Sequence, residues 1–82
     1  MTVILGVKTQ DRADNAVKIQ KILTEYGCFI KTRLGLNSVK NENCPNEALI
    51  LLNIPLKEKA VIIENRLLDI SGTETQRMEF DF

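Results

Sequence analysis

The stretch Ala48-Leu49-Ile50-Leu51-Leu52-Asn53-Ile54 decides the fold of this chain, because it is apolar on both sides of an extended backbone. Aliphatic residues of this kind favour a strand, which we place at Glu47–Ile54, and the following Pro55 suits the first turn of a helix. Successive strand residues point to opposite faces of a sheet. One face therefore receives Ala48, Ile50, Leu52 and Ile54, and the other face receives Leu49 and Leu51.

Outward from this strand, the spacing of apolar residues predicts two helices and three more strands. The strands are expected at Thr2–Thr9, Cys28–Leu36 and Thr73–Phe80, and the helices at Arg12–Tyr26 and Leu56–Leu68. The order β-α-β-β-α-β predicts an α+β, ferredoxin-like sandwich, in which a four-stranded antiparallel sheet carries two helices on one face. We expect a single domain over residues 1–82, because a chain of this length fits one such module.

The second face of the predicted sheet is the feature with a functional consequence. The first and third strands are central in this fold, and both helices cover the same face. Leu49 and Leu51, joined by Ile4 and Phe29, would then project from the uncovered face. Scattered exposed apolar side chains are normal, but a contiguous stripe indicates an interaction surface. We therefore expect a homo-dimer or tetramer, with these four residues at the subunit interface.

Composition excludes several classes of partner. Lys+Arg and Asp+Glu are both 11, so the net charge is zero, whereas binders of DNA or of membrane surfaces carry a basic excess. RNA-binding domains of this fold stack bases on aromatic residues of the two central strands, and here those strands contain none. The start Met1–Val7 lacks a basic segment, and no apolar run is long enough to span a bilayer. We expect a cytoplasmic protein with no direct nucleic-acid or membrane partner.

Two cysteines, Cys28 and Cys44, are the candidates for thiol chemistry. Metal carriers of this fold use a Cys-x-x-Cys pair after the first strand, where this chain has Thr9-Gln10-Asp11-Arg12. The chain also has no histidine, which removes the commonest metal ligand and general base. The simpler interpretation is a buried thiol at Cys28 and a loop thiol at Cys44. The alternative function is a thiol-dependent metal or redox protein that uses both cysteines.

A candidate ligand site lies at the end of the second predicted strand. A glycine inside a strand often marks a bulge or a close approach of the backbone, and Gly35 follows Arg33 in the segment Arg33-Leu34-Gly35-Leu36-Asn37. A long polar loop, residues 37–46, follows and contains Asn43 and Cys44. Arg33, Gly35, Asn37, Asn43 and Cys44 could line a small-ligand pocket at a subunit boundary. The alternative is a bulge that bends the strand, with Arg33 facing solvent.

The chain resembles the ACT-like family of iron-only hydrogenase system regulators, which is similar in fold to the C-terminal domain of the nickel-responsive repressor. The resemblance runs from Val3 to about Phe80, and Arg-x-Gly in the second strand is its most specific element. It is carried by Thr2-Val3-Ile4-Leu5-Gly6-Val7, Asp11-Arg12, Arg33-Leu34-Gly35-Leu36, Ala48-Leu49-Ile50-Leu51-Leu52 and Ile70-Ser71-Gly72.

The resemblance implies a non-catalytic bacterial regulatory domain of the cytoplasm, which forms dimers or tetramers and binds small ligands at its interfaces. Nickel sensing does not carry over, because the repressor's site depends on histidines and this chain has none. The hairpin between the second and third strands is also longer than in many relatives. We expect an oligomeric ligand-sensing domain that is not an enzyme and needs no cofactor or metal.

Overall fold

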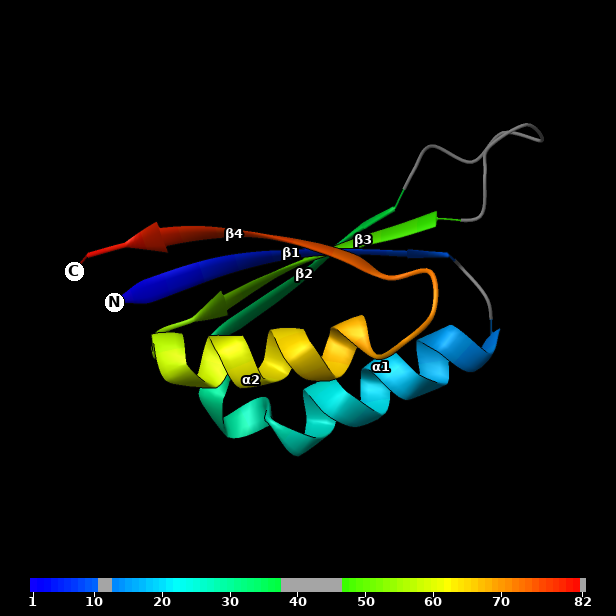
Figure 1. Ribbon diagram of the computed structural model, residues 1–82, viewed down its shortest axis with the longest axis horizontal. Coiled ribbons are helices and arrows are strands. Elements are labelled where there is room, and N and C mark those ends of the chain that lie inside the picture. The colour runs from blue at the N-terminus through cyan, green and yellow to red at the C-terminus, as the bar shows by residue number, and fades with distance from the viewer. Residues whose placement is uncertain (11–12, 38–46, 82) are drawn as a thin grey trace.

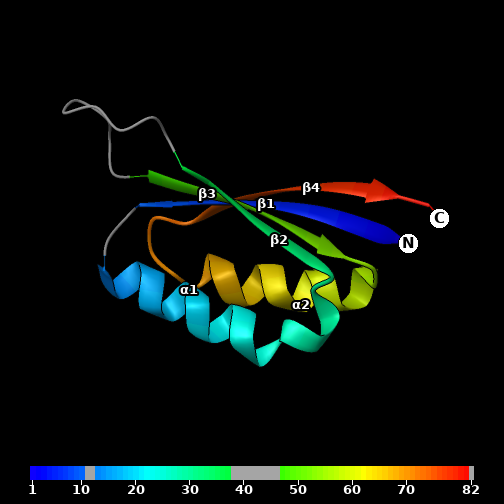
Figure 2. The same ribbon diagram turned by 180° about the vertical axis from the view of Figure 1, so that it is seen from behind.

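The computed structural model describes residues 1–10, 13–37 and 47–81. Its elements follow the order β1 (Thr2–Gln10), α1 (Ala13–Glu25), η1 (Gly27–Phe29), β2 (Thr32–Asn37), β3 (Glu47–Ile54), α2 (Lys57–Leu68) and β4 (Glu74–Phe80). The four strands form one antiparallel sheet in the order β2-β3-β1-β4, so β1 and β3 are central. Both helices lie on one face of this sheet, and the two views agree on it (Figures 1 and 2). The ferredoxin-like α+β architecture is confirmed.

The core fills the space between the sheet and the two helices. Alternation along β1 and β3 sends one set of side chains toward the helices, where Leu5, Leu52 and Ile54 are almost fully buried. α1 contributes Ile19, Ile22 and Leu23 at helical spacing, and α2 contributes Ala60, Ile63 and Leu67. Because the helices lie on the same side, this core covers only one face of the sheet.

A buried polar cluster holds the end of β1 to the helix layer. Asn15, in the first turns of α1, donates hydrogen bonds from Nδ2 to Thr9 Oγ1 and to the Ser71 carbonyl, both at 3.2 Å. Thr9 Oγ1 also lies 3.1 Å from Thr73 Oγ1. Buried polar groups are tolerated when they are paired in this way. The cluster therefore links β1, α1 and the connection between α2 and β4.

The second strand begins later than the expected Cys28–Leu36. Residues Gly27–Phe29 form a 3₁₀ turn, because the Phe29 amide donates to the Tyr26 carbonyl at 2.9 Å and the Ile30 amide to the Gly27 carbonyl at 3.2 Å. These bonds extend the helical path beyond α1, and β2 starts only at Thr32. The prediction of strand from Cys28 onward was wrong for its first four residues, because alternation of apolar residues does not exclude a short helical turn.

Candidate functional site

The face of the sheet that turns away from the helices, called here the open face, is the candidate functional surface. Strand register places Leu34 opposite Leu51, Leu36 opposite Leu49, and Ile4 opposite Met78. Four strands thus contribute to one apolar surface. Leu34, Leu36, Leu49, Met78 and Phe80 are each more than two-fifths exposed, and Ile4 and Leu51 are half-buried between them.

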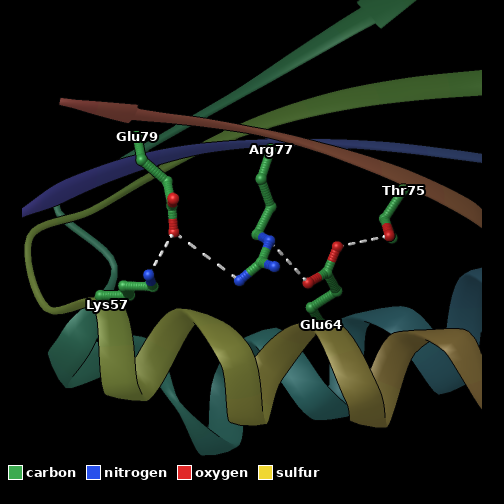
Figure 3. Close-up of polar contacts among 5 residues, drawn as sticks. All are labelled: Lys57, Glu64, Thr75, Arg77 and Glu79. Atoms are coloured by element: carbon green, nitrogen blue, oxygen red, sulfur yellow. Dashed lines mark hydrogen bonds and ion pairs between the residues drawn. The ribbon is translucent and has the colours of Figure 1, made fainter.

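The edge strand β4 contributes exposed apolar side chains to the open face. Arg77 and Glu79 point toward α2, as Figure 3 shows, whereas Met78 and Phe80 lie on the open face together with Glu74 and Gln76. Arg77 Nε lies 3.1 Å from Glu64 Oε1, and Lys57 Nζ lies 3.1 Å from Glu79 Oε1. An edge strand that faced only water would be expected to turn its charges outward and its apolar residues inward. β4 instead turns Arg77 and Glu79 onto a helix and places Met78 and Phe80, beside Glu74 and Gln76, on the open face.

A hollow lies over Gly6 near the middle of the open face. Gly6 sits between Leu51 of β3 and Gln76 of β4 in one row across the sheet, and it has no side chain to fill the row. The hollow has a volume of about 340 Å³ and is lined mainly by hydrocarbon from residues that include Ile4, Leu51 and Met78. Ligand pockets usually have volumes of roughly 300–1,000 Å³, so this one is at the small end of that range.

Polar groups lie at one end of the hollow. Lys8 and Glu74 are opposite each other in the pairing of β1 with β4, next to Gln76 on the same face. All three residues line the hollow together with the apolar group. The arrangement can hold an apolar molecule that carries one polar end.

The structure places three of the four predicted interface residues on the open face. Ile4, Leu49 and Leu51 all line the hollow. Phe29 does not lie in a strand: it belongs to η1, half-buried, with the Lys59 ammonium 4.6 Å from the centre of its ring. The prediction that Phe29 lies on the second face was wrong, because β2 begins only at Thr32, three residues after Phe29. Sequence reasoning missed Leu34, Leu36, Met78 and Phe80, although strict alternation from Leu49 and Leu51 through the sheet register leads to them.

The predicted ligand-site residues do not gather into one described pocket. Arg33 lies on the helix side of β2 and donates a hydrogen bond to Gln20 Oε1 of α1. Gly35 is paired in an uninterrupted register, and a Cβ built on it would meet nothing within 4 Å, so it marks neither a bulge nor a close approach. Asn37 ends β2, while Asn43 and Cys44 lie outside the described residues. The proposed ligand role of these five residues stays a prediction.

The cysteines give no support to a thiol centre in the described part of the chain. Cys28 is exposed in η1, so the expectation that it is a buried thiol was wrong. Cys44 lies outside the described residues. Within residues 1–10, 13–37 and 47–81, no three Cys, Asp or Glu side chains come together as a possible metal site. Likewise, no helix in those ranges is long and apolar enough to cross a bilayer.

Comparison with known proteins bears on the fold alone. No protein-family model and no curated protein matches the chain. Among solved structures, an uncharacterized protein from Thermotoga maritima, TM1266, superposes with a TM-score of 0.81 at 20% identity, over 94% of this chain and 92% of that one. A de novo designed protein, Foldit4, gives a TM-score of 0.58 at 16% identity, over 98% and 97% of the two chains. At such identities the likeness shows the shared ferredoxin-like fold.

Proposed function

We propose that this chain is a non-catalytic regulatory domain that senses a small ligand as an oligomer, with a second copy covering the open face. The observation that carries the proposal is the orientation of β4, which turns Arg77 and Glu79 onto α2 and leaves Met78 and Phe80 outside. Together with Leu49 and Leu51 of β3, this places an exposed apolar stripe on the face that the helices leave uncovered. The helices cover only the opposite face, and the proposal therefore assigns a second copy to the open face.

The size of the open face supports this assignment. With strands about 4.8 Å apart and a rise of about 3.3 Å per residue, four strands of about seven residues outline roughly 440 Å². The apolar stripe occupies most of this area, beside the polar residues Lys8, Glu74 and Gln76 at one end. Monomeric proteins rarely expose contiguous apolar patches larger than a few hundred Å². A second copy is a suitable occupant because an identical sheet offers an equally apolar surface, and two-fold pairing is the commonest arrangement of homo-oligomers.

The hollow over Gly6 is the proposed ligand position. It opens onto the surface that the second copy would cover, so a bound molecule would be enclosed between two subunits. Binding at such a place couples ligand to assembly, because the ligand stabilises only the assembled form. Its apolar lining with Lys8 and Glu74 at one end fits a small molecule with a hydrocarbon body and a polar group. The resemblance to ACT-like regulators of the bacterial cytoplasm points to the same role.

The proposal is tested by the mass of the protein in solution. Light scattering at tens of micromolar should show at least two chains for the natural sequence, and a smaller mass for Leu49→Lys/Leu51→Lys, because a lysine pair cannot be buried against its own copy. The matched control is Val17→Lys/Ile62→Lys, which adds the same charge at exposed apolar positions of the helix layer. The control should leave the mass unchanged. A natural protein that is monomeric under these conditions would contradict the proposal.

A further inference from the structure

We infer that the outer edge of β4 is a second interface, at which β4 pairs antiparallel with β4 of another copy. β4 is the last strand in the sheet order, and its outer side pairs with none of the described strands. Natural edge strands are usually protected by proline, a bulge or repelling charge. β4 runs for seven residues without glycine or proline and in continuous register with β1. Its backbone is therefore ready to accept another strand.

The charges of β4 are complementary to those of a second β4. Arg77 and Glu79 are two residues apart on the same face of the strand. In an antiparallel pair centred on Met78, Arg77 of each copy lies opposite Glu79 of the other, which gives two opposite-charge pairs at directly facing positions. A pair centred on Arg77 would place two guanidinium groups together. A pair centred on Gln76 would place Arg77 opposite Thr75, so the register centred on Met78 is the favoured one.

These side chains remain accessible to a second copy despite their contacts with α2. The side chains of Arg77 and Glu79 are each 35% exposed, while Glu64, which binds Arg77 from below, is 13% exposed. The intramolecular ion pairs restrict the rotamers of Arg77 and Glu79 on the helix side of the strand. Oppositely charged pairs across strands contribute to pairing, and holding them in place lowers the entropy lost on association.

The opposite edge of the sheet, β2, has no complementary charges for pairing with a second β2. β2 is six residues long, contains Gly35, and carries Arg33 as its single charged residue. No antiparallel pairing of two β2 strands places that arginine opposite an acidic residue within the strand. Of the two edges, β4 is therefore the one whose sequence favours its own copy.

The two interfaces are geometrically compatible. Antiparallel pairing that continues a sheet has its two-fold axis perpendicular to the sheet, whereas packing of two open faces has its axis within the plane of the sheet. Perpendicular two-fold axes close into a tetramer. Edge pairing would also join two open faces side by side, with the helices of both copies on the other side. The edge interface does not depend on the open face, so each can be tested without the other.

Light scattering of four variants separates the two interfaces. We expect four chains for the natural protein, two for Leu49→Lys/Leu51→Lys, two for Glu79→Lys, and one for the combined variant. Glu79→Lys places a second cation opposite Arg77. The control Glu25→Lys loses a comparable exposed ion pair, the 3.1 Å contact with Arg66 on the helix layer, and should keep four chains. If Leu49→Lys/Leu51→Lys is monomeric and Glu79→Lys changes nothing, the edge inference is overturned while the open-face interface stands. An edge that pairs with a strand of another protein, and not with its own copy, would give this same result and would likewise overturn the inference.

Cysteine crosslinking tests the register directly. In a Cys28→Ser/Cys44→Ser/Leu49→Lys/Leu51→Lys background, oxidised Met78→Cys should give a covalent dimer, because residue 78 faces its own copy at disulfide distance. Gln76→Cys is the control on the same face. In this register the two copies of residue 76 lie about 13 Å apart along the strands, too far for a disulfide. Crosslinking at residue 76 in preference to residue 78, or at neither, would overturn the inference.

Discussion

At the scale of single residues, Gly6 has the largest effect on the candidate site. Glycine inside a strand weakens it, since it adds backbone entropy to the unfolded chain and gives no side chain to pack. Nothing in the backbone requires glycine here, because Gly72 is the described residue with a positive φ, at 81°. A Cβ built on Gly6 would meet Gln76 O and Leu51 Cδ2 at 3.7 Å, which is ordinary contact. Gly6 is therefore explained by the space that it leaves on the open face.

Filling that space should abolish ligand binding and leave the fold intact. Gly6→Val places two methyl groups over the floor of the hollow and raises strand propensity, so the free energy of unfolding should stay unchanged or rise by roughly 0.5–1 kcal/mol. Compounds that raise the melting temperature of the natural protein in a screen of amino acids and nucleotides should have no effect on Gly6→Val. The control Gly35→Val fills open space on β2 and should keep the response. A response retained by Gly6→Val would place the ligand elsewhere.

At the scale of elements, β4 shows which features of a strand can be predicted from the sequence and which cannot. Strict alternation along its sequence places Met78 and Phe80 on one face and Thr75, Arg77 and Glu79 on the other, and the strand register agrees with this division. Alternation does not say which face meets the helices. The choice depends on acidic and basic residues of α2, where Glu64 and Lys57 meet the charges of β4. Charges on one face of an edge strand are commonly solvated, whereas here Arg77 and Glu79 lie against a helix.

The predicted start of the second strand was wrong for a related reason. Cys28 and Ile30 alternate as a strand would, yet the chain keeps its helical path through Phe29. The ring of Phe29 is then held beside Lys59 of α2, a contact between segments far apart in sequence. Apolar periodicity is local, so it predicted the central strands, whose burial follows from their composition. It could not predict a turn that is stabilised by a tertiary contact.

The contact between β4 and α2 gives a prediction at this scale. Glu64 accepts a hydrogen bond from Thr75 Oγ1 at 2.7 Å. It also forms an ion pair with Arg77, whose Nε lies 3.1 Å from Glu64 Oε1. Its side chain is 13% exposed, so water replaces these contacts poorly. Glu64→Ala should lower the free energy of unfolding by about 1–2 kcal/mol. Lys57→Ala breaks the more exposed pair with Glu79 and should cost at most about 0.5 kcal/mol. Urea denaturation of both variants measures the difference, and equal losses would contradict the assignment.

At the scale of the whole molecule, one fact links fold to function. Two helices cover one face of a four-stranded sheet, and this sequence also places an apolar stripe on the other face. The order of elements predicted the layers, and the double-sided β3 predicted that the second face matters. The extent of the open face over all four strands was not predictable from β3 alone, because the contributions of Leu34, Leu36, Met78 and Phe80 depend on register across the sheet.

Assembly through the open face should make thermal stability depend on protein concentration. A chain of 82 residues has a small core, so under the proposed assembly subunit contacts would form a large part of its stability. For a dimer, each tenfold rise in concentration adds about 0.7 kcal/mol per chain, which for a domain of this size corresponds to roughly 3–6 °C in melting temperature. Calorimetry over two decades of concentration measures this slope. The variant Leu49→Lys/Leu51→Lys/Glu79→Lys should melt at a lower temperature that does not change with dilution, because it has neither interface. A natural protein whose melting temperature is equally insensitive to dilution would show that the open face is stable in water without a second copy.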